Sequence, residues 1–339
     1  MASGSLVEAP PGLSPLALSV DMQKQPVIVI VGPTATGKTD LAITLAQQFG
    51  GEIISADSRQ IYRYMDIGTA KPTAEQRAAA PHHLIDFVSP DVPYTVAQYQ
   101  QDALAAIGAI HAAGRIPIIT GGTGLYIRAV VDGLAIPAVT PQPALRHAWE
   151  KLIAQQGATA LHRQLQELDP TAAASIPATN TRRVIRALEV CIVTGRPFSA
   201  QRTATPPSFT PLLLGLIAER TELYQRADAR VDQMLARGLV TEVRMLTERG
   251  YGWELPAMSG LGYRQIGAYL RGEMSLAAAI ARLKYDTHHY IRRQIVWFRP
   301  DPRIHWLDIT APGSTAHALQ LVAAHIASAR QSKSHKETI

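Results

Sequence analysis

The chain has 339 residues, of which 47% are hydrophobic and 18% are charged, a balance typical of a globular protein with a buried core. This composition argues against wholesale disorder, and the longest apolar runs, 27–31 and 212–218, are far shorter than the ~20 residues of a membrane span. The single cysteine, Cys191, excludes an internal disulfide framework and any multi-cysteine zinc site. No secretory signal pattern opens the chain, so we expect a cytoplasmic protein without membrane contact.

Basic residues exceed acidic ones by 33 to 27, which gives a formal net charge of +6. The excess alone is weak support for a nucleic-acid partner, because many enzymes are mildly basic. Its distribution is more informative, since residues 182–202 and 282–303 are both dense in arginine. These two segments either form one binding patch in space or are two ordinary solvated helix faces.

The N-terminal part of the chain alternates strand-like and helix-like segments. Residues 1–25 are rich in Pro, Gly and Ser, and we expect this leader to be disordered. The β-branched run 26–31 is typical of a buried parallel strand, and it precedes a glycine-containing loop and a helix over 40–49. Further strands are predicted over 52–56 and 116–120, with a helix over 93–113 between them. This alternation predicts a parallel sheet with crossover helices.

The character of the sequence changes at about residue 134. Apolar residues then recur at helical spacing and prolines separate short helices, so we expect a helical insertion over 134–211. A strand over 211–217 rejoins the sheet, and later helices are predicted over 221–237, 239–249, 262–270, 275–297 and 315–329. The fold class expected is therefore α/β, with a P-loop NTPase-like parallel sheet core formed by 26–133 and 212–310, the helical insertion domain, and a C-terminal helix and tail over 311–339.

The segment after the first strand fits the pattern G-x-x-x-x-G-K-[ST] in full and lies between a strand and a helix, as a phosphate-binding loop requires. Its glycines let successive backbone N–H groups face an anion, and the helix N-terminus adds its dipole. Lys38 would contact the terminal phosphate oxygens, and Thr39 would bind Mg²⁺. The alternative is a chance glycine-rich turn. The residues expected to bind the diphosphate are Gly32, Pro33, Thr34, Ala35, Thr36, Gly37, Lys38 and Thr39.

Three absences narrow the identity of the phosphate compound. The chain has no [NT]-K-x-D guanine reader, no hydrophobic strand ending in Asp-Glu and no obvious adenine-binding loop. We therefore expect the loop to hold a diphosphate that is not part of ATP.

Asp57 follows the second predicted strand, at the sheet edge where ligands bind in open α/β folds. It is placed to act as a general base or to hold a metal-bound water, and the alternative is a helix cap. Gln60 has an amide that can donate to and accept from an adenine edge.

Two further segments carry weaker signals. The glycines of Gly121–Tyr126 permit close approach of a ligand to the backbone after the third strand. The adjacent His82 and His83 suggest a metal site, but the sequence offers no further ligands at the right spacing.

These motifs together resemble those of the tRNA dimethylallyltransferase family, whose members prenylate an adenosine beside the anticodon. They follow the family's order across residues 26–300, so the resemblance covers most of the chain. The matching segments are Gly32–Thr39, Asp57–Gln60, Asp66–Pro72, His82–Asp86, Gly121–Tyr126, Thr181–Val190, Gly260–Arg264 and Arg292–Arg299.

The resemblance implies that dimethylallyl diphosphate binds in the phosphate loop and that the exocyclic amine of adenine attacks its allylic carbon. Asp57 would take the amine proton, while Thr34 would bond the bridging oxygen of the diphosphate. Lys38, Thr39 and Mg²⁺ would stabilise the departing charge. Two further arginines stand where the family carries diphosphate contacts, namely Arg220 and Arg230.

The resemblance also implies an anticodon stem-loop as partner, with the target adenine turned out of its stack and with the helical insertion over 134–211 contacting the tRNA. Arginine and aromatic side chains suit looped RNA because they pair with phosphates and stack on splayed bases. The implied tRNA-binding residues are Asp57, Ser58, Arg59, Gln60, Thr123, Arg146, Arg182, Arg183, Arg186, Gly262, Tyr263, Arg264, Arg292, Arg293, Gln294 and Arg299.

The chain departs from the family pattern in a few places. Tyr290-Ile-Arg-Arg-Gln294 stands where Ala-Lys-Arg-Gln is usual, and Ser259 stands where some members carry a basic residue, so one RNA contact is expected to be missing. Eukaryotic members add a zinc-finger tail, which a single cysteine cannot form, so the resemblance is to the bacterial type. We expect a monomer. The alternatives are a P-loop kinase for a small metabolite and a non-catalytic RNA-binding NTPase.

Overall fold

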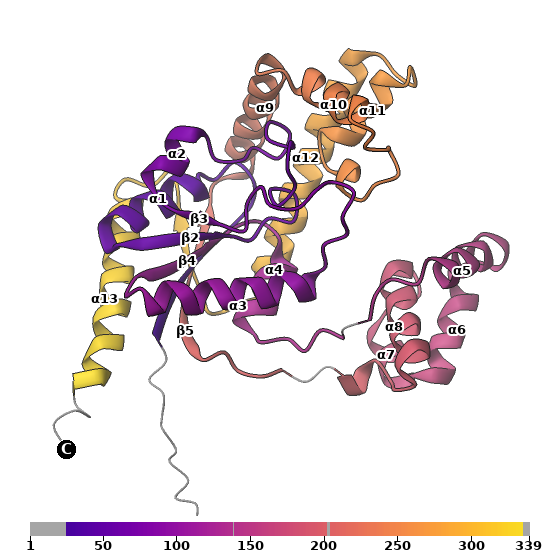
Figure 1. Cartoon of the computed structure of the whole chain (residues 1–339), viewed down its shortest axis with the longest axis horizontal. Coiled ribbons are helices and arrows are strands. Elements are labelled where there is room, and N and C mark those ends of the chain that lie inside the picture. Colours follow the sequence, from indigo (N-terminus) through magenta and orange to yellow (C-terminus); the bar gives the residue numbers. More distant parts are fainter. Residues whose placement is uncertain (1–24, 138, 202–203, 335–339) are drawn as a thin grey trace, which may run out of the picture.

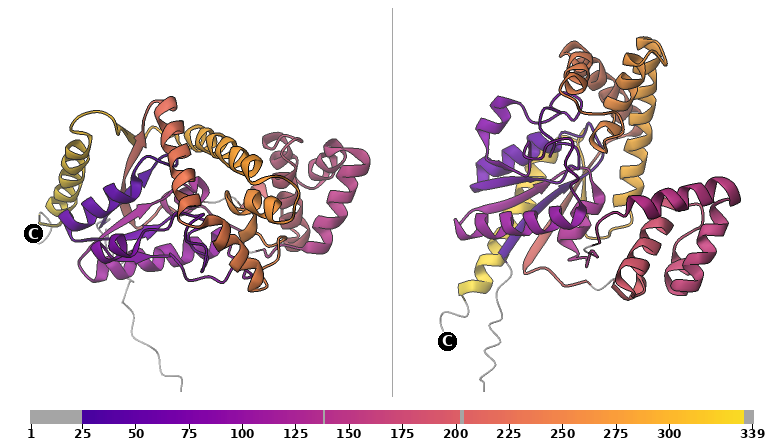
Figure 2. Two further views of the ribbon diagram at one scale, coloured as in Figure 1. Left: turned by 90° about the horizontal axis from the view of Figure 1, so that it is seen from above. Right: turned by 45° about the vertical axis from the view of Figure 1, so that its right-hand side comes forward.

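The computed structural model describes residues 25–137, 139–201 and 204–334. The expected disordered leader lies outside the described residues, apart from Gln25, which already belongs to the first strand. Residues 335–339 of the expected tail lie outside them as well. Figures 1 and 2 show an α/β body with a smaller group of helices standing beside it. None of the helices in the described part of the chain combines the length and hydrophobicity needed to cross a lipid bilayer.

The body is built on a six-stranded sheet in which every neighbouring pair is parallel. This confirms the α/β class expected from the alternation of strands and helices. The strand order is β3-β2-β4-β1-β5-β6. The strands are β1 (Gln25–Val31), β2 (Gly51–Ser55), β3 (His82–His83), β4 (Ile116–Thr120), β5 (Phe209–Ile217) and β6 (Ile304–Asp308).

The two outer strands, β3 and β6, were missed in the sequence because neither has a clear strand pattern. β3 has two residues, and β6 buries only part of its side chains. β5 begins at Phe209 rather than at the predicted Pro211. A proline is tolerated there because β6 pairs with β5 only from Leu213 onward, so the missing N–H costs no hydrogen bond to β6.

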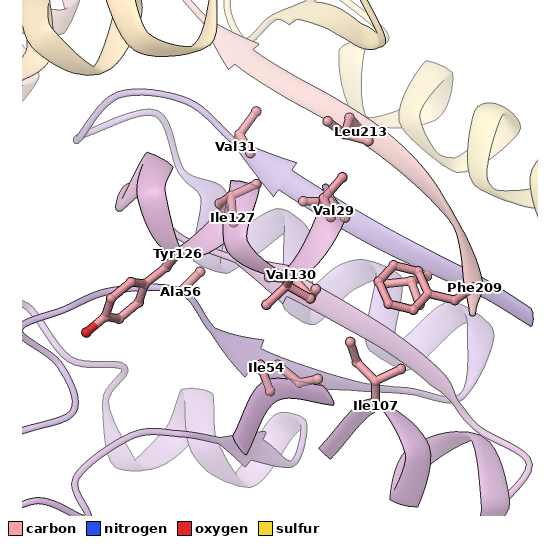
Figure 3. Close-up of a cluster of buried hydrophobic side chains, with 14 of the residues drawn as sticks. Val29, Val31, Ile54, Ala56, Ile107, Tyr126, Ile127, Val130, Phe209 and Leu213 are labelled. Atoms are coloured by element: carbon pink, nitrogen blue, oxygen red, sulfur yellow. The ribbon is translucent and has the colours of Figure 1, made fainter. Parts of the chain in front are cut away.

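Alternate residues of β1 face two different hydrophobic layers. Val27, Val29 and Val31 belong to the layer shown in Figure 3, whereas Ile28 and Ile30 belong to the layer on the opposite face. All five side chains are fully buried, and each contributes roughly 1.5–3 kcal/mol of hydrophobic stabilisation. A strand that is apolar at every position is thus explained by helices on both faces of the sheet.

Two pairs of helices form these layers. The first face packs against α3 (Val96–Ala112) and α4 (Gly124–Val131), and the second against α1 (Lys38–Phe49) and α13 (Ser314–Ser334). The predicted helices over 40–49, 93–113 and 315–329 are therefore present with shifted ends. A short helix, α2 (Ala74–Ala79), follows the loop after β2.

A third group of helices packs on the loop that follows β2. Its apolar core joins Ile61, Tyr62 and Met65 of that loop to side chains of the helices. The predicted helices over this region agree with the structure to within about two residues. The group comprises α9 (Arg220–Ala236), α10 (Leu239–Glu248), η2 (Ala257–Ser259), α11 (Tyr263–Leu270) and α12 (Leu276–Phe298).

The remaining helices stand apart from the body and have a hydrophobic core of their own (Figures 1 and 2). They overlap the predicted insertion, whose end at residue 211 differs from the structure because β5 starts at Phe209. The role of this unit in binding tRNA stays a prediction. Its elements are α5 (Pro143–Gln156), α6 (Ala158–Leu168), α7 (Pro170–Ser175), α8 (Thr181–Thr194) and η1 (Ser199–Gln201).

Candidate active site

The loop between β1 and α1 has the backbone geometry of an anion cradle. Gly32 has φ +137°, and a Cβ there would lie 2.4 Å from the carbonyl oxygen of Leu216 in β5. Gly37, the N-cap of α1, has φ +76° and offers no side-chain cap to the first helical N–H groups. These groups are therefore available to a bound anion, together with the positive end of the helix dipole.

Lys38 lies folded over this loop, with its Nζ donating to the carbonyl oxygen of Pro33 at 2.6 Å. Burial and the nearby positive charge of Arg230 lower the pKa of Lys38 to about 7, against a smaller opposing effect of Asp57. Burial also lowers the pKa of Arg230, while Asp57 counteracts that shift. Two desolvated cations beside one carboxylate make this cavity attractive to a multiply charged anion.

Asp57 lies in the turn directly after β2. Its Oδ1 accepts hydrogen bonds from the backbone N–H groups of Arg59 at 2.8 Å and Gln60 at 3.4 Å. Oδ1 thus caps the backbone of this turn, which was the alternative role that the sequence left open for Asp57. Oδ2 has no hydrogen-bond partner among the described residues, so it remains available to a substrate.

Two cavities meet at Asp57. One, of about 350 Å³, is lined by the phosphate loop together with Ser55, Gln60 and Thr120. The other, of about 380 Å³, opens toward the arginine-rich helices. Both are lined by Thr34, Asp57, Arg230 and Met234. A group bound in the first cavity can therefore meet a group bound in the second at the Asp57 carboxylate.

The side-chain amide of Gln60 is bonded to two nearby segments of the same chain. Its Nε2 donates to the carbonyl oxygens of Thr69 at 3.3 Å and Ala70 at 3.1 Å, and its Oε1 accepts from the Ser55 hydroxyl at 3.3 Å. Reading an adenine edge would require these bonds to be exchanged. That role stays a prediction.

The glycine-rich loop after β4 is bonded to the Asp57 turn. Thr123 accepts a hydrogen bond from the backbone N–H of Ser58 at 3.0 Å, and its own N–H donates to Ala56 at 3.1 Å. A Cβ at Gly121 would lie 2.2 Å from the carbonyl oxygen of Ala56. Close approach of two backbones, as well as access for a ligand, therefore explains the glycine there.

The arginines of α12 lie on the surface near these cavities. Arg292 and Arg293 are exposed, and the Arg293 guanidinium carbon lies 5.8 Å from the ring centroid of Tyr290. Arg299 is exposed at the end of α12. A larger, mainly apolar cavity of about 870 Å³ also borders Arg292 and Arg293, between α4 and the end of α12, but it includes no residue of the phosphate loop.

The predicted residues around α11 differ in their accessibility. Arg264 lines the cavity on the arginine side, with half of its side chain exposed, and donates to Asp286 at 2.7 Å. Gly262 is the N-cap of α11 with φ +89°. Tyr263 is fully buried but borders the same cavity, and its contact with tRNA stays a prediction. Arg59 reaches across to η2, where its guanidinium donates to the Ser259 hydroxyl at 3.1 Å.

The arginines of the helical unit fall into two kinds. Arg182 and Arg183 are exposed, and Arg182 lines the same cavity as Arg264. Arg146 and Arg186 instead bind Glu189, whose side chain is fully buried, at 2.8 and 2.7 Å.

The carboxylate of Glu189 is held in its charged form by these partners. Burial opposes that charge, but hydrogen bonds from Arg146, the Gln142 backbone and Arg186 outweigh it and lower the pKa of Glu189 to about 2. Arg146 and Arg186 therefore have a structural role, and their contact with tRNA stays a prediction.

Glu242 of α10 is an organising residue that the sequence analysis did not single out. Its Oε2 accepts from the backbone N–H groups of Asp66 and Ile67, at 2.9 and 2.7 Å. Its Oε1 accepts from the Gly68 N–H at 3.0 Å and from the Tyr263 hydroxyl at 2.7 Å. No local pattern could reveal it, because the carboxylate and the loop are 174 or more residues apart.

The paired histidines lie in β3 and use their rings within the fold. His82 bonds the carbonyl oxygen of Ala80 through Nδ1 at 2.8 Å, and His83 bonds the carboxylate of Glu52. No group of three His, Cys, Asp or Glu side chains arranged to hold a metal ion is found in the described ranges. Each histidine thus uses one ring nitrogen within the fold, whereas the buried Nε2 of His82, a residue that lines the cavity of the phosphate loop, has no hydrogen-bond partner among the described residues.

Comparisons with known proteins agree with this geometry. The IPP transferase family matches residues 60–301, and the isopentenyl transferase family matches 25–85. A tRNA dimethylallyltransferase of Roseiflexus sp. (strain RS-1) is 54% identical over 297 residues, which cover 88% of this chain and 97% of that protein. Another, of Thermomicrobium roseum, is 52% identical and covers 86% of this chain and 88% of its own length.

Solved structures give the same result. A tRNA isopentenylpyrophosphate transferase of Bacillus halodurans superposes with a TM-score of 0.69 and 38% identity, covering 92% of this chain and all 100% of its own. A eukaryotic dimethylallyltransferase acting on tRNA gives a TM-score of 0.73 at 29% identity, and the match covers 88% of this chain and 78% of that protein's chain. The kinase alternative is not favoured. The family expected from the motifs is confirmed, and this chain belongs to the tRNA dimethylallyltransferases.

Proposed function

We propose that this protein transfers a dimethylallyl group from dimethylallyl diphosphate to an adenosine of tRNA, releasing diphosphate. The acceptor is the exocyclic amine of the adenosine 3′ to the anticodon, in tRNAs that read codons beginning with U. The observation that carries the proposal is the meeting of two cavities at Asp57, Thr34 and Arg230. A two-substrate transfer needs such a meeting point.

The donor fits the cavity lined by the phosphate loop. Its diphosphate would accept hydrogen bonds from the free N–H groups at the start of α1 and would draw Lys38 away from the Pro33 carbonyl. Arg230 faces the same cavity and would balance the negative charge. Thr34 lies where this cavity meets the other, so its hydroxyl is placed to bond the bridging oxygen.

The acceptor fits the cavity on the arginine side. The amine nitrogen forms a bond to the allylic carbon as the carbon–oxygen bond breaks, and the electron pair leaves with the diphosphate. The amine proton passes to Asp57, whose Oδ2 has no hydrogen-bond partner in the described part of the chain. A positioned base of this kind is worth about 10²–10⁴ in rate.

A Mg²⁺ ion fits the residues present. Thr39 lines the diphosphate cavity, and so does Thr120, whose buried Oγ1 has no hydrogen-bond partner among the described residues. Thr39 would hold the ion, with the substrate's oxygens completing its coordination, because Mg²⁺ prefers phosphate oxygens and water to all-protein cages. The ion would supply charge neutralisation for the leaving diphosphate.

The exposed arginines are the candidates for holding the anticodon stem-loop. Arg182, Arg264 and Arg293 line the acceptor cavity, Arg292 directly precedes Arg293 on α12, and Arg299 is the C-cap of that helix. They would pair with phosphates and stack on unpaired bases. We expect the protein to act as a monomer in the cytoplasm.

The proposal is tested by incubating purified protein with dimethylallyl diphosphate, Mg²⁺ and bulk tRNA, followed by mass measurement of the digested nucleosides. We expect a new adenosine derivative heavier by one C5H8 unit, absent when the donor is omitted. Consumption of nucleoside triphosphate with no change in RNA mass would refute the proposal.

A further inference from the structure

Gln294 lies within the arginine-rich segment of α12, yet its surroundings differ from those of its neighbours. Arg292 and Arg293 are exposed, whereas Gln294 is only 4% exposed. Successive residues of a helix point about 100° apart, so adjacent side chains serve different surfaces. Arg293 lines the acceptor cavity, and Gln294 lines the diphosphate cavity.

The amide of Gln294 joins two loops of the active site. Its Oε1 accepts a hydrogen bond from the backbone N–H of Thr34 at 2.9 Å, and its Nε2 donates to the carbonyl oxygen of Gly122 at 3.1 Å. Both of its functional atoms are thus bonded to backbone groups of the protein. A Cβ at Gly122 would lie 2.1 Å from that Nε2, so the glycine leaves room for the amide.

These bonds connect the two reacting groups indirectly. Thr34 belongs to the phosphate loop, and the loop of Gly122 is bonded through Thr123 to Ser58, next to Asp57. Gln294 therefore fixes the distance between the diphosphate site and the carboxylate. A displacement of the order of 1 Å at such a site is enough to cost about 100-fold in rate.

We propose that Gln294 is a positioning residue for the diphosphate substrate and not a tRNA contact, although it directly follows Arg292 and Arg293 on α12. This inference rests on the proposed function for the identity of the two substrates. It replaces the tRNA-binding role expected for Gln294 from the sequence.

The test compares two adjacent substitutions in the full chain, Gln294→Met and Arg293→Met. Pyrophosphate with Mg²⁺ is titrated into each protein by calorimetry without RNA, and tRNA affinity is measured separately by filter binding. Loss of two hydrogen bonds at Gln294 should weaken pyrophosphate binding and raise the KM for dimethylallyl diphosphate by about 10-fold, with tRNA affinity unchanged. Arg293→Met should show the reverse pattern.

A second pair of variants separates positioning from simple stability. Gln294→Asn keeps both an acceptor and a donor on a shorter side chain without adding charge, and it should fall between the wild type and Gln294→Met. Gly122→Ala should weaken pyrophosphate binding when Gln294 is present. In a protein that also carries Gln294→Ala the effect should be smaller, because the alanine at position 294 leaves room for the methyl group added at position 122.

Two results would overturn the inference. One is pyrophosphate binding that stays unchanged in every Gln294 variant, whatever their unfolding temperatures. The other is weaker tRNA binding with normal pyrophosphate affinity in Gln294→Met. Pyrophosphate binding does not depend on prenyl transfer, so a wild-type protein that failed to modify tRNA would refute the proposed function alone.

Discussion

The two cavities that meet at Asp57 are built in different ways. The diphosphate cavity takes the free N–H groups at the start of α1 and the Lys38 ammonium from one continuous segment, Gly32–Thr39, after β1. The acceptor cavity collects single side chains from α8, α11 and α12, among them Arg182, Arg264 and Arg293. The first is preformed by a local turn, whereas the second depends on how distant helices pack. Substitutions should therefore act locally in the first and through tertiary structure in the second.

Asp57 belongs to both cavities, so its loss should have the largest effect on turnover. Asp57→Asn keeps the side chain's shape and an oxygen that can accept from Arg59 and Gln60, but it removes the base. We expect the rate of prenyl transfer to fall by roughly 10²–10⁴-fold in single-turnover measurements. Affinity for tRNA should change little. A variant that transferred at the wild-type rate would show that Asp57 is only a cap.

Lys38 of the phosphate loop should make donor binding depend on pH. Its pKa is about 7 in the free protein, and an arriving diphosphate raises it, so binding above pH 7 takes up a proton. Donor affinity should then fall by up to about tenfold per pH unit above 7.

The proton uptake by Lys38 is measurable by calorimetry in buffers of different ionisation enthalpy. Lys38→Arg is the control, since a guanidinium stays charged across this range and the slope above pH 7 should disappear. A wild-type affinity that stays flat between pH 7 and 9 would contradict the assignment.

Arg292 and Arg293 should govern RNA affinity without affecting the donor. The double substitution Arg292→Gln, Arg293→Gln removes two cationic groups, so the slope of log affinity against log salt should decrease by about 1–2. Filter binding of tRNA over a range of salt concentrations measures it. The matched control is Arg226→Gln on α9, whose guanidinium pairs with Glu222 and lines neither cavity. If the control lost as much of the salt dependence, the effect would come from the removal of positive charge in general and not from the location of these arginines on α12.

Substitution of Glu189 should lower the stability of the protein and leave tRNA affinity unchanged. This result would distinguish the arginines paired with Glu189 from the exposed arginines of α12. The folded pKa of Glu189, about 2, lies below its ordinary 4.5, so its stabilising contribution is present above pH 4.5 and is lost as the pH falls toward 2. Glu189→Gln should lower the unfolding temperature of the helical unit at pH 7, and this difference should shrink on acidification. Thermal unfolding followed by circular dichroism tests it. An unchanged profile would show that the pair with Arg146 and Arg186 contributes no stability.

Much of the fold could be predicted from local sequence patterns. The run of β1 and the phosphate loop are contiguous, and the turn after β2 follows directly from the strand that precedes it. A motif in which each residue is a near neighbour of the next can be interpreted from order alone. The edge strand β6 could not be, because its alternating exposure and its short length resemble a loop.

The candidate site was less accessible to prediction wherever partners lie far apart in the sequence. Arg146 and Arg293 have the same chemistry, yet one is bound by a buried carboxylate 43 residues away and the other faces a cavity. Gln294 lies 260 residues from the Thr34 backbone that it bonds. The sequence shows which residues are basic or polar, but only the packing of the helices shows which of them are already engaged.

The wall shared by the two cavities has a stereochemical consequence. The purine amine would approach from one cavity, and the diphosphate would be held in the other. The attacking nitrogen and the departing oxygen would then lie on opposite sides of the transferred allylic carbon. A donor made chiral at that carbon by deuterium should therefore emerge on the RNA with inverted configuration.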